Sequence, residues 1–337
     1  MPIGADLVLR EKPDVDAILL DGRRLGEVVV EAARRYRTPL AFPLMDLMLE
    51  KQAMLVALGF PADQVETYHF DAPPTDEMLA TLEERLAQSD LPRLRAHVES
   101  VHYVTEHADL VPIGMTIGPF SLMTRLISQP IVPVYQAGRG VTADQDRGVA
   151  AVERCLDLAL RTILFSIDLQ LAAGAEAIFI AEPAANQIYI SPRQLDAGSD
   201  VFERYVMQPN RRLRERIEQA GAQLIFHCCG EISAHMLRGF ASLDPAILSL
   251  GSSRRLWEDA AMVSRNTVLF GNIPSKRFFS DEISEDRVRE LARELVERMR
   301  EVGHPFILGS ECDVLSMKGF EEPIRRKVAA LLECRPG

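Results

Sequence analysis

Hydrophobic and polar positions follow two rhythms along this chain, which predict short strands separated by amphipathic helices. Apolar runs that end in polar or turn-forming residues predict eight strands, at 39–47, 64–71, 110–119, 175–182, 222–229, 246–251, 267–272 and 306–312. Between the later strands the spacing becomes helical, as at 284–302, where Val288, Leu291 and Leu295 recur on one face. The alternation of strands and helices predicts an α/β fold with a parallel sheet.

Eight strands that alternate with helices predict a (β/α)8 TIM barrel. Residues 1–37 precede the first strand and read as an N-terminal helical layer, so we expect one barrel domain over 1–337. An open, doubly wound sheet is the alternative. However, no G-x-G-x-x-G string follows an early strand and no G-x-x-x-x-G-K-[ST] string occurs, which disfavours nucleotide-binding folds.

Composition and charge restrict the possible partners. Hydrophobic residues make up 47% of the 337 positions and charged residues 26%, which is typical of a globular protein. The formal net charge of -11 argues against a broad basic surface for nucleic acid. The sequence contains no run of 18 apolar residues and does not start like a secretion signal. We therefore expect a cytoplasmic protein that binds neither nucleic acid nor membrane.

The five cysteines differ in their surroundings. An odd number of cysteines in a chain without an export signal disfavours a disulfide framework and favours metal or nucleophile roles. Cys155 lies within a helical stretch and reads as a packing residue, and Cys334 reads as a surface thiol. Cys228 faces away from its neighbours in a regular strand, which again indicates packing. Cys229 and Cys312 remain, both at strand ends.

The apolar run at 224–226 continues into His227-Cys228-Cys229-Gly230, and this is the strongest chemical signal in the chain. Alternate strand residues face the same side, so His227 and Cys229 are directed to one place. Cys312 ends the last predicted strand. An imidazole and two thiolates predict a zinc site, with packing of all three side chains as the alternative.

Other polar residues stand at the carboxyl ends of predicted strands, where TIM barrels hold their active sites. We expect Asp46 and Glu182 near the substrate, where they would move or orient protons, with His69 in a similar role. Asn272 would form a polar wall. Helix capping, turn formation or support of a neighbouring residue is the competing interpretation of each.

Five segments carry a resemblance to a known superfamily. Residues 116–120, 173–183, 227–230, 270–274 and 306–314 resemble conserved strands and turns of the uroporphyrinogen decarboxylase superfamily, and the resemblance extends over about 38–332. The combination of His-x-Cys-Gly with a late cysteine is similar to its zinc-dependent corrinoid methyltransferases. That group includes methylcobalamin:coenzyme M methyltransferases and the first methyltransferases of O-demethylase systems.

The resemblance implies that His227, Cys229 and Cys312 hold Zn²⁺ with one open coordination position. Such a zinc either binds a thiol as thiolate or polarises the oxygen of a methyl ether. The corrinoid would arrive on a separate corrinoid protein, because no Asp-x-His-x-x-Gly string occurs in this chain. The direction of methyl transfer stays open. Residues 41–47 and 68–71 look like the opening of O-demethylase methyltransferases and favour a methyl-ether donor, such as a methoxylated aromatic, over a thiol acceptor.

Two departures from the superfamily's patterns define the alternatives. Some relatives supply an acidic fourth ligand after the next strand, but residues 248–253 contain no carboxylate, which leaves water, substrate, Glu182 or Glu311. Decarboxylases carry an arginine-rich Met-Arg-Gln-Ala-Gly-Arg segment for tetrapyrrole carboxylates, and residues 43–51 lack it. The missing segment disfavours a uroporphyrinogen-type decarboxylase, which is the first alternative to a methyltransferase. A non-catalytic, zinc-stabilised barrel with an assembly role is the second, although structural zinc sites usually have four protein ligands.

Overall fold

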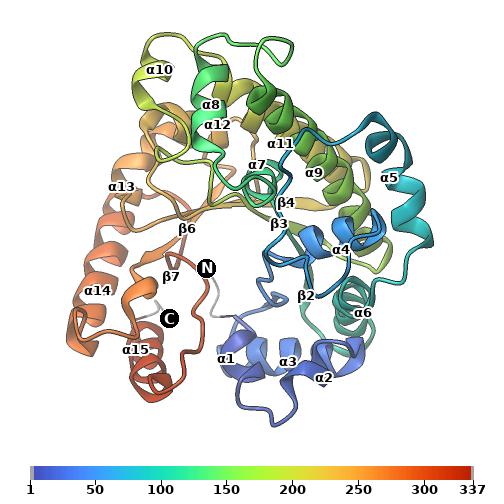
Figure 1. Ribbon diagram of the computed structural model, residues 1–337. Helices are drawn as coiled ribbons and strands as arrows, with labels where there is room; N and C mark the ends of the chain where they lie inside the picture. Colours follow the sequence, from blue (N-terminus) through green and yellow to red (C-terminus); the bar gives the residue numbers. More distant parts are fainter. Residues whose placement is uncertain (1–3, 335–337) are drawn as a thin grey trace.

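Seven parallel strands form one curled sheet in the computed structural model, which describes residues 4–334 (Figure 1). They are β1 Leu40–Ala41, β2 Val111–Ile117, β3 Ala177–Ala181, β4 Gln223–Cys228, β5 Ile247–Leu250, β6 Val268–Ile273 and β7 Phe306–Ser310. Each strand pairs with the next one along the chain, and helices make every crossover, as parallel pairing requires. Within 4–334 no ladder joins β7 to β1, so the sheet is a half-barrel.

Helices surround the sheet on its outer face (Figure 1). The α-helices are α1 Asp6–Leu9, α2 Val15–Ile18, α3 Gly22–Arg35, α4 Leu49–Ala57, α5 Asp76–Gln88, α6 Pro92–His107, α7 Pro119–Thr124, α8 Ile131–Gly138, α9 Arg147–Ala172, α10 Pro192–Asp196, α11 Gln208–Gln219, α12 Ala234–Ala241, α13 Leu256–Asp259, α14 Glu285–Val302 and α15 Glu321–Glu333. A π-helical segment, Glu203–Met207, precedes α11, and 3-10 turns occupy Ala260–Met262 and Ser275–Arg277.

The strand expected at 64–71 is absent from the described sheet, so that strand prediction was wrong, while the seven-stranded parallel curled sheet is consistent with a TIM-like barrel. The segment turns because its amides bond locally: Tyr68 N donates to the carbonyl of Gln64 at 3.0 Å. Its aromatic side chains pack on one another and on Phe60 instead of on a neighbouring strand. The rings of Tyr68 and Phe70 pack against Phe60, with centroids 4.2 and 6.1 Å from the Phe60 ring. The α/β class and the parallel curled sheet agree with the prediction.

The first strand is much shorter than the expected 39–47. Pro43 has no amide hydrogen to offer a ladder, and Asp46 begins a turn in which its Oδ1 accepts from Met48 N at 3.0 Å. Only Leu40–Ala41 therefore pairs with β2. The chain then leaves the sheet through a bent segment that leads into α4.

Two apolar clusters lie on opposite faces of the sheet. The inner cluster includes Phe42, Met115, Phe179, Ile225 and Phe270, while the larger outer cluster joins the strands to the helices. Strand β3 alternates strictly between these clusters, as a parallel strand buried on both faces does. The inner cluster leaves an apolar, water-poor floor below the carboxyl ends of the strands.

The helices α1, α2 and α3 precede the first strand, and α3 packs on α6. Gly26 allows this close approach, because an added Cβ would lie 2.6 Å from the Cβ of Tyr103. The start of the described chain is also tied to the segment after β7, since Asp6 Oδ2 accepts from Ser316 N at 2.7 Å. The assignment of 1–37 as an added layer on a single domain stays a prediction. Every helix within 4–334 is too short or too polar to cross a bilayer.

Candidate metal centre

Strand β4 supplies the candidate ligand His227, and the candidate ligand Cys229 follows directly after its last residue. Leu224, Phe226 and Cys228 belong to the outer cluster, so His227 faces the interior beside Ile225. Cys228 is fully buried, and its thiol lies 3.7 Å from the carbonyl of Ala185. The expectation that Cys228 packs away from the site thus agrees with the structure.

The third candidate comes from the last strand. Register between β6 and β7 pairs Ile273 with Ser310, and the chain continues from there to Cys312, whose carbonyl accepts from Ser275 Oγ at 3.0 Å. The ligand atoms of His227, Cys229 and Cys312 all lie within 4.8 Å of one another. The folded chain therefore brings together the three residues that the sequence singled out. Their role as metal ligands stays a prediction.

His227 is held in one orientation and has one ring nitrogen available. Its Nδ1 lies 2.9 Å from Ser249 Oγ, on the neighbouring strand β5. The ring stacks on Phe179, with centroids 5.4 Å apart and planes 28° apart. Within the described chain the buried Nε2 has no hydrogen-bond partner. An unpartnered imidazole nitrogen near two thiols fits a metal ligand, since a hydrogen bond at the other nitrogen usually orients such a histidine.

A hydrogen bond links the two thiols and separates their pKa values. The hydrogen bond from Cys312, helped by His227 and Lys276 and opposed by burial, lowers the pKa of Cys229 to about 3. The same hydrogen bond, together with burial, raises the pKa of Cys312 far above its usual range. The surroundings therefore favour the thiolate form of Cys229 over that of Cys312. A divalent metal would bind both residues as thiolates, with release of protons.

Lys276 and Glu311 lie beside the thiols. Lys276 Nζ donates to the carbonyl of Cys229 at 2.8 Å and lies 3.9 Å from Glu311 Oε2. Glu311 is buried, and its Oε2 also accepts from Ser252 Oγ at 2.7 Å and Ser252 N at 3.1 Å. Glu311 is thus engaged with Ser252 and Lys276, outside the group of three candidate ligands. Lys276 was not predicted from the sequence, although it lies only two residues beyond the turn at 270–274 that resembles the superfamily.

The family model described as Uroporphyrinogen decarboxylase (URO-D) matches residues 5–328. The chain belongs to the uroporphyrinogen decarboxylase family. The resemblance inferred from the sequence is confirmed. Among solved structures, a "methyltransferase from Methanosarcina mazei" is similar with a TM-score of 0.66 and 17% sequence identity, over 98% of this chain and 90% of that one. No curated protein matches the sequence.

A structure with 17% sequence identity supports the fold of this family member, whereas its chemistry has to be inferred from its own side chains.

Glu182, the residue after β3, is fully buried. Its Oε1 accepts from Ser121 N at 2.6 Å and its Oε2 from Asn210 Nδ2 at 2.9 Å. Burial raises the pKa of Glu182 above its ordinary value, although these hydrogen bonds act in the opposite direction. Gly118 is required here, because a Cβ at that position would lie 2.1 Å from Glu182 Oε2.

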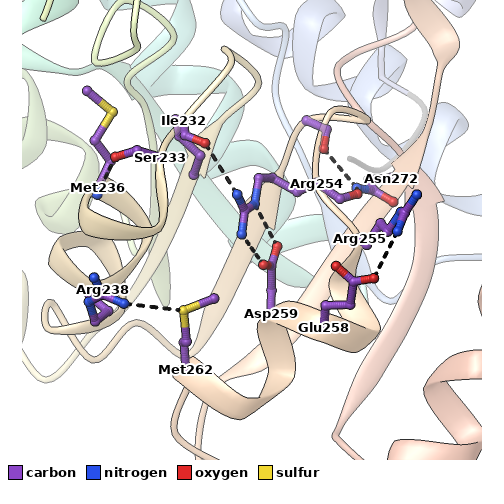
Figure 2. A network of polar contacts seen from close by, with 11 residues as sticks. Ile232, Ser233, Met236, Arg238, Arg254, Arg255, Glu258, Asp259, Met262 and Asn272 are labelled. Carbon is purple, nitrogen blue, oxygen red and sulfur yellow. Dashed lines mark hydrogen bonds and ion pairs between the residues drawn. The ribbon is translucent and has the colours of Figure 1, made fainter. Parts of the chain in front are cut away.

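The other acid and amide expected near the substrate also have protein partners. Asp46 forms an ion pair with Arg93 from α6 and caps the turn at Met48. Asn272 is buried, and its Nδ2 donates to the carbonyls of Gly251 at 2.8 Å and Arg254 at 2.9 Å, as Figure 2 shows for the latter. These contacts match the turn and cap interpretations. Any further catalytic role of Asp46 or Asn272 stays a prediction.

His69 is half-buried in the irregular segment between α4 and α5, outside the sheet. It follows Tyr68 and precedes Phe70, which anchor the segment on Phe60. The candidate metal ligands in the described chain are His227 and the two cysteines, so neither His69 nor the acids belong to that group. A catalytic role for His69 stays a prediction.

Proposed function

We propose that this family member is a zinc-dependent methyltransferase, which moves a methyl group between a small molecule and a corrinoid carried by a separate protein. The observation that carries the proposal is the convergence of the unpartnered His227 Nε2 with the thiols of Cys229 and Cys312, since their ligand atoms all lie within 4.8 Å of one another. Three protein ligands are typical of catalytic zinc sites, whereas structural sites usually have four. The similarity to a methyltransferase in fold supports the same proposal.

His227, Cys229 and Cys312 would hold the zinc. Bound there, zinc supplies a Lewis acid with an open position, which favours the thiolate of an acceptor or polarises the ether oxygen of a donor. Ser249 fixes the histidine ring, and the inner apolar cluster excludes water below the site. Lys276 places a positive charge beside the sulfur ligands, and its own pKa is raised by Cys229 and Glu311 despite burial.

The substrate side of the proposal is a methyl ether, such as a methoxylated aromatic, with a thiol acceptor as the opposite direction. The inner cluster beneath the ligands is apolar and contains three phenylalanines, Phe42, Phe179 and Phe270. An aromatic ring system suits such a floor, because aromatic side chains stack edge-to-face or offset with one another. Phe42 and Phe179 already adopt an edge-to-face pair with centroids 5.7 Å apart.

The test is a methyl-transfer assay on zinc-loaded protein, with free cobalt(I) corrinoid and, separately, methylated corrinoid. Methoxylated aromatics, methylamines and thiols are offered in parallel. The proposal expects methyl exchange with one class, and loss of exchange in Cys229→Ser but not in Cys334→Ser, whose cysteine lies on α15's far end. Consumption of uroporphyrinogen without any methyl exchange would instead establish the decarboxylase. Stoichiometric zinc without either activity would favour the assembly role.

A further inference from the structure

A second candidate binding site lies outside the metal group. A groove of about 790 Å³ lies between the segment after β5, the end of β6 and α14. We call it the arginine groove, because its lining includes Arg254, Arg255, Arg277, Arg287 and Arg298. Arg254 is paired with the buried Asp259, so the other four arginines and the two lining carboxylates, Glu258 and Glu294, leave two positive charges in excess. This local charge stands against a formal net charge of -11 for the chain.

Arg254 is a fixed part of the wall. Its guanidinium forms a two-pronged ion pair with Asp259, which is only 1% exposed, with Nε 2.9 Å from Oδ2 (Figure 2). It also donates to the carbonyl of Ile232 at 3.4 Å. These contacts hold the loop after β5 in place and satisfy Arg254, so the capacity to bind an anion comes from the other four arginines.

Those four arginines have only weak partners. Their side chains are each more than half exposed, and their ion pairs are with exposed neighbours: Arg255–Glu258, Arg277–Glu282, Arg287–Glu290 and Arg298–Glu301, at 3.0, 3.8, 2.9 and 3.3 Å. Exposed pairs of this kind contribute about 0 to 1 kcal/mol. The guanidinium groups can therefore exchange these carboxylates for a ligand at little cost.

We propose that the arginine groove binds a small anionic molecule that carries at least two phosphate or carboxylate groups. Guanidinium groups bind both kinds of oxyanion through paired hydrogen bonds, and several of them on two facing elements can hold two anionic groups at once. The volume lies in the range of small-molecule sites, about 300 to 1,000 Å³. Trp257, also in the lining, adds a flat apolar surface beside the charges.

The arginine groove is separate from the metal group but shares Ser252 and Asn272 with its surroundings. Ser252 lines the groove and donates to Glu311, the neighbour of Cys312. None of the three candidate metal ligands is among the lining residues described. The inference therefore goes beyond the proposed methyl transfer and does not depend on it.

The test uses the only tryptophan of the chain, Trp257, as its reporter. Full-length protein is titrated with pyrophosphate and, in a parallel arm, with the tricarboxylate tricarballylate, both at constant ionic strength, and with sodium chloride as reference. We expect a saturable change in Trp257 emission, with matching heats by calorimetry. Arg277→Gln and Arg287→Gln should each raise the Kd about tenfold. The control Arg23→Gln, on α3 and 78% exposed, should leave the Kd unchanged.

The stronger of the two probes identifies phosphate or carboxylate as the preferred group. Several results would overturn the proposal: no saturable signal by emission or heat with either probe, the same response to sodium chloride, or equal Kd values in Arg277→Gln, Arg287→Gln and Arg23→Gln. Because all three side chains are exposed, the variants should keep the thermal midpoint of the parent, and two independent groove variants guard against local unfolding of one.

Discussion

Glu182 and His227 stand at the ends of adjacent strands, and Glu182 N donates to the carbonyl of His227 at 2.8 Å. Both side chains are buried, but their hydrogen bonding differs. Each carboxylate oxygen of Glu182 accepts from a neighbouring element, whereas His227 Nε2 has no partner in the described chain. A buried polar group with complete hydrogen bonds holds a structure together, while an incomplete one near other ligands awaits a binding partner.

The largest effect on stability is expected at Glu182, whose carboxylate oxygens both accept hydrogen bonds. Glu182→Ala leaves Ser121 N without its acceptor, removes one of the two acceptors of Asn210 Nδ2, and opens a cavity between α7 and α11. We expect a loss of about 3 to 5 kcal/mol in the free energy of unfolding. Urea denaturation measures it, and Asp46→Ala, at a half-buried position, is the control with a smaller loss. A Glu182 variant that is as stable as the parent but inactive would show that Glu182 acts in catalysis.

Glu50 on α4 is a buried acid with an incomplete set of hydrogen bonds that is not part of the candidate metal site. It is fully buried; its Oε1 accepts from Ser166 Oγ at 3.0 Å, but within 4–334 its Oε2 has no partner. Burial raises the pKa of Glu50 to about 8, and Glu50 is absent from the group of candidate ligands. An isolated incomplete acid is therefore expected to keep a proton rather than bind a metal.

The sign of the resulting pH dependence follows from the raised pKa. The stabilisation by protonated Glu50 is fully present below its unfolded-state pKa, near 4.5, and is lost as the pH rises towards 8. Glu50→Gln, which copies the neutral acid, should therefore gain about 3 kcal/mol relative to the parent between pH 5 and pH 8. Denaturation at both pH values measures this gain. A constant difference between the two proteins would mean that Glu50 is ionised in the folded state.

The candidate site around His227, whose Nε2 has no partner in the described chain, is tested by its zinc affinity. Cys312→Ser removes one of the two thiols near His227 Nε2, so zinc affinity should fall about 100-fold or more, which corresponds to about 2.7 kcal/mol. Competition with a chelator measures the affinity. Cys228→Ser keeps the site intact, because Cys228 faces the outer cluster, and it should bind zinc like the parent. Equal loss in both variants would mean that general unfolding, not ligation, lowers the affinity.

The sequence predicted the late strands better than the early ones, for a physical reason. Strands such as β4 and β7 are continuous apolar runs between clear breakers, and their register alone sends His227 and Cys312 to one end of the sheet. The segment at 64–71 has the same alternation, but its apolar residues pack on Phe60 instead of pairing with a strand. Periodicity indicates which residues are buried, not what they are buried against.

The supporting residues were beyond sequence reasoning for a related reason. Ser249 lies within residues 248–253, where the sequence showed only that a carboxylate is absent. Its hydrogen bond to His227 depends on the register between β4 and β5. Lys276 acts on Cys229 from a turn after β6, 47 positions away in the chain. Glu182 lies at the predicted strand end, but only the positions of α7 and α11 determine that both its oxygens are engaged.

The smallest predicted effect concerns the bond that prepares His227 for metal. Ser249→Ala removes the partner of Nδ1 without touching a candidate ligand, so the ring loses its fixed orientation but keeps its stacking on Phe179. Such supporting partners typically change metal affinity by about 10- to 100-fold. We expect about tenfold weaker zinc binding, and Ser249→Thr, which retains the hydroxyl, should restore most of it. If alanine and threonine variants bind zinc as tightly as the parent, the ligands and Phe179 alone orient the histidine.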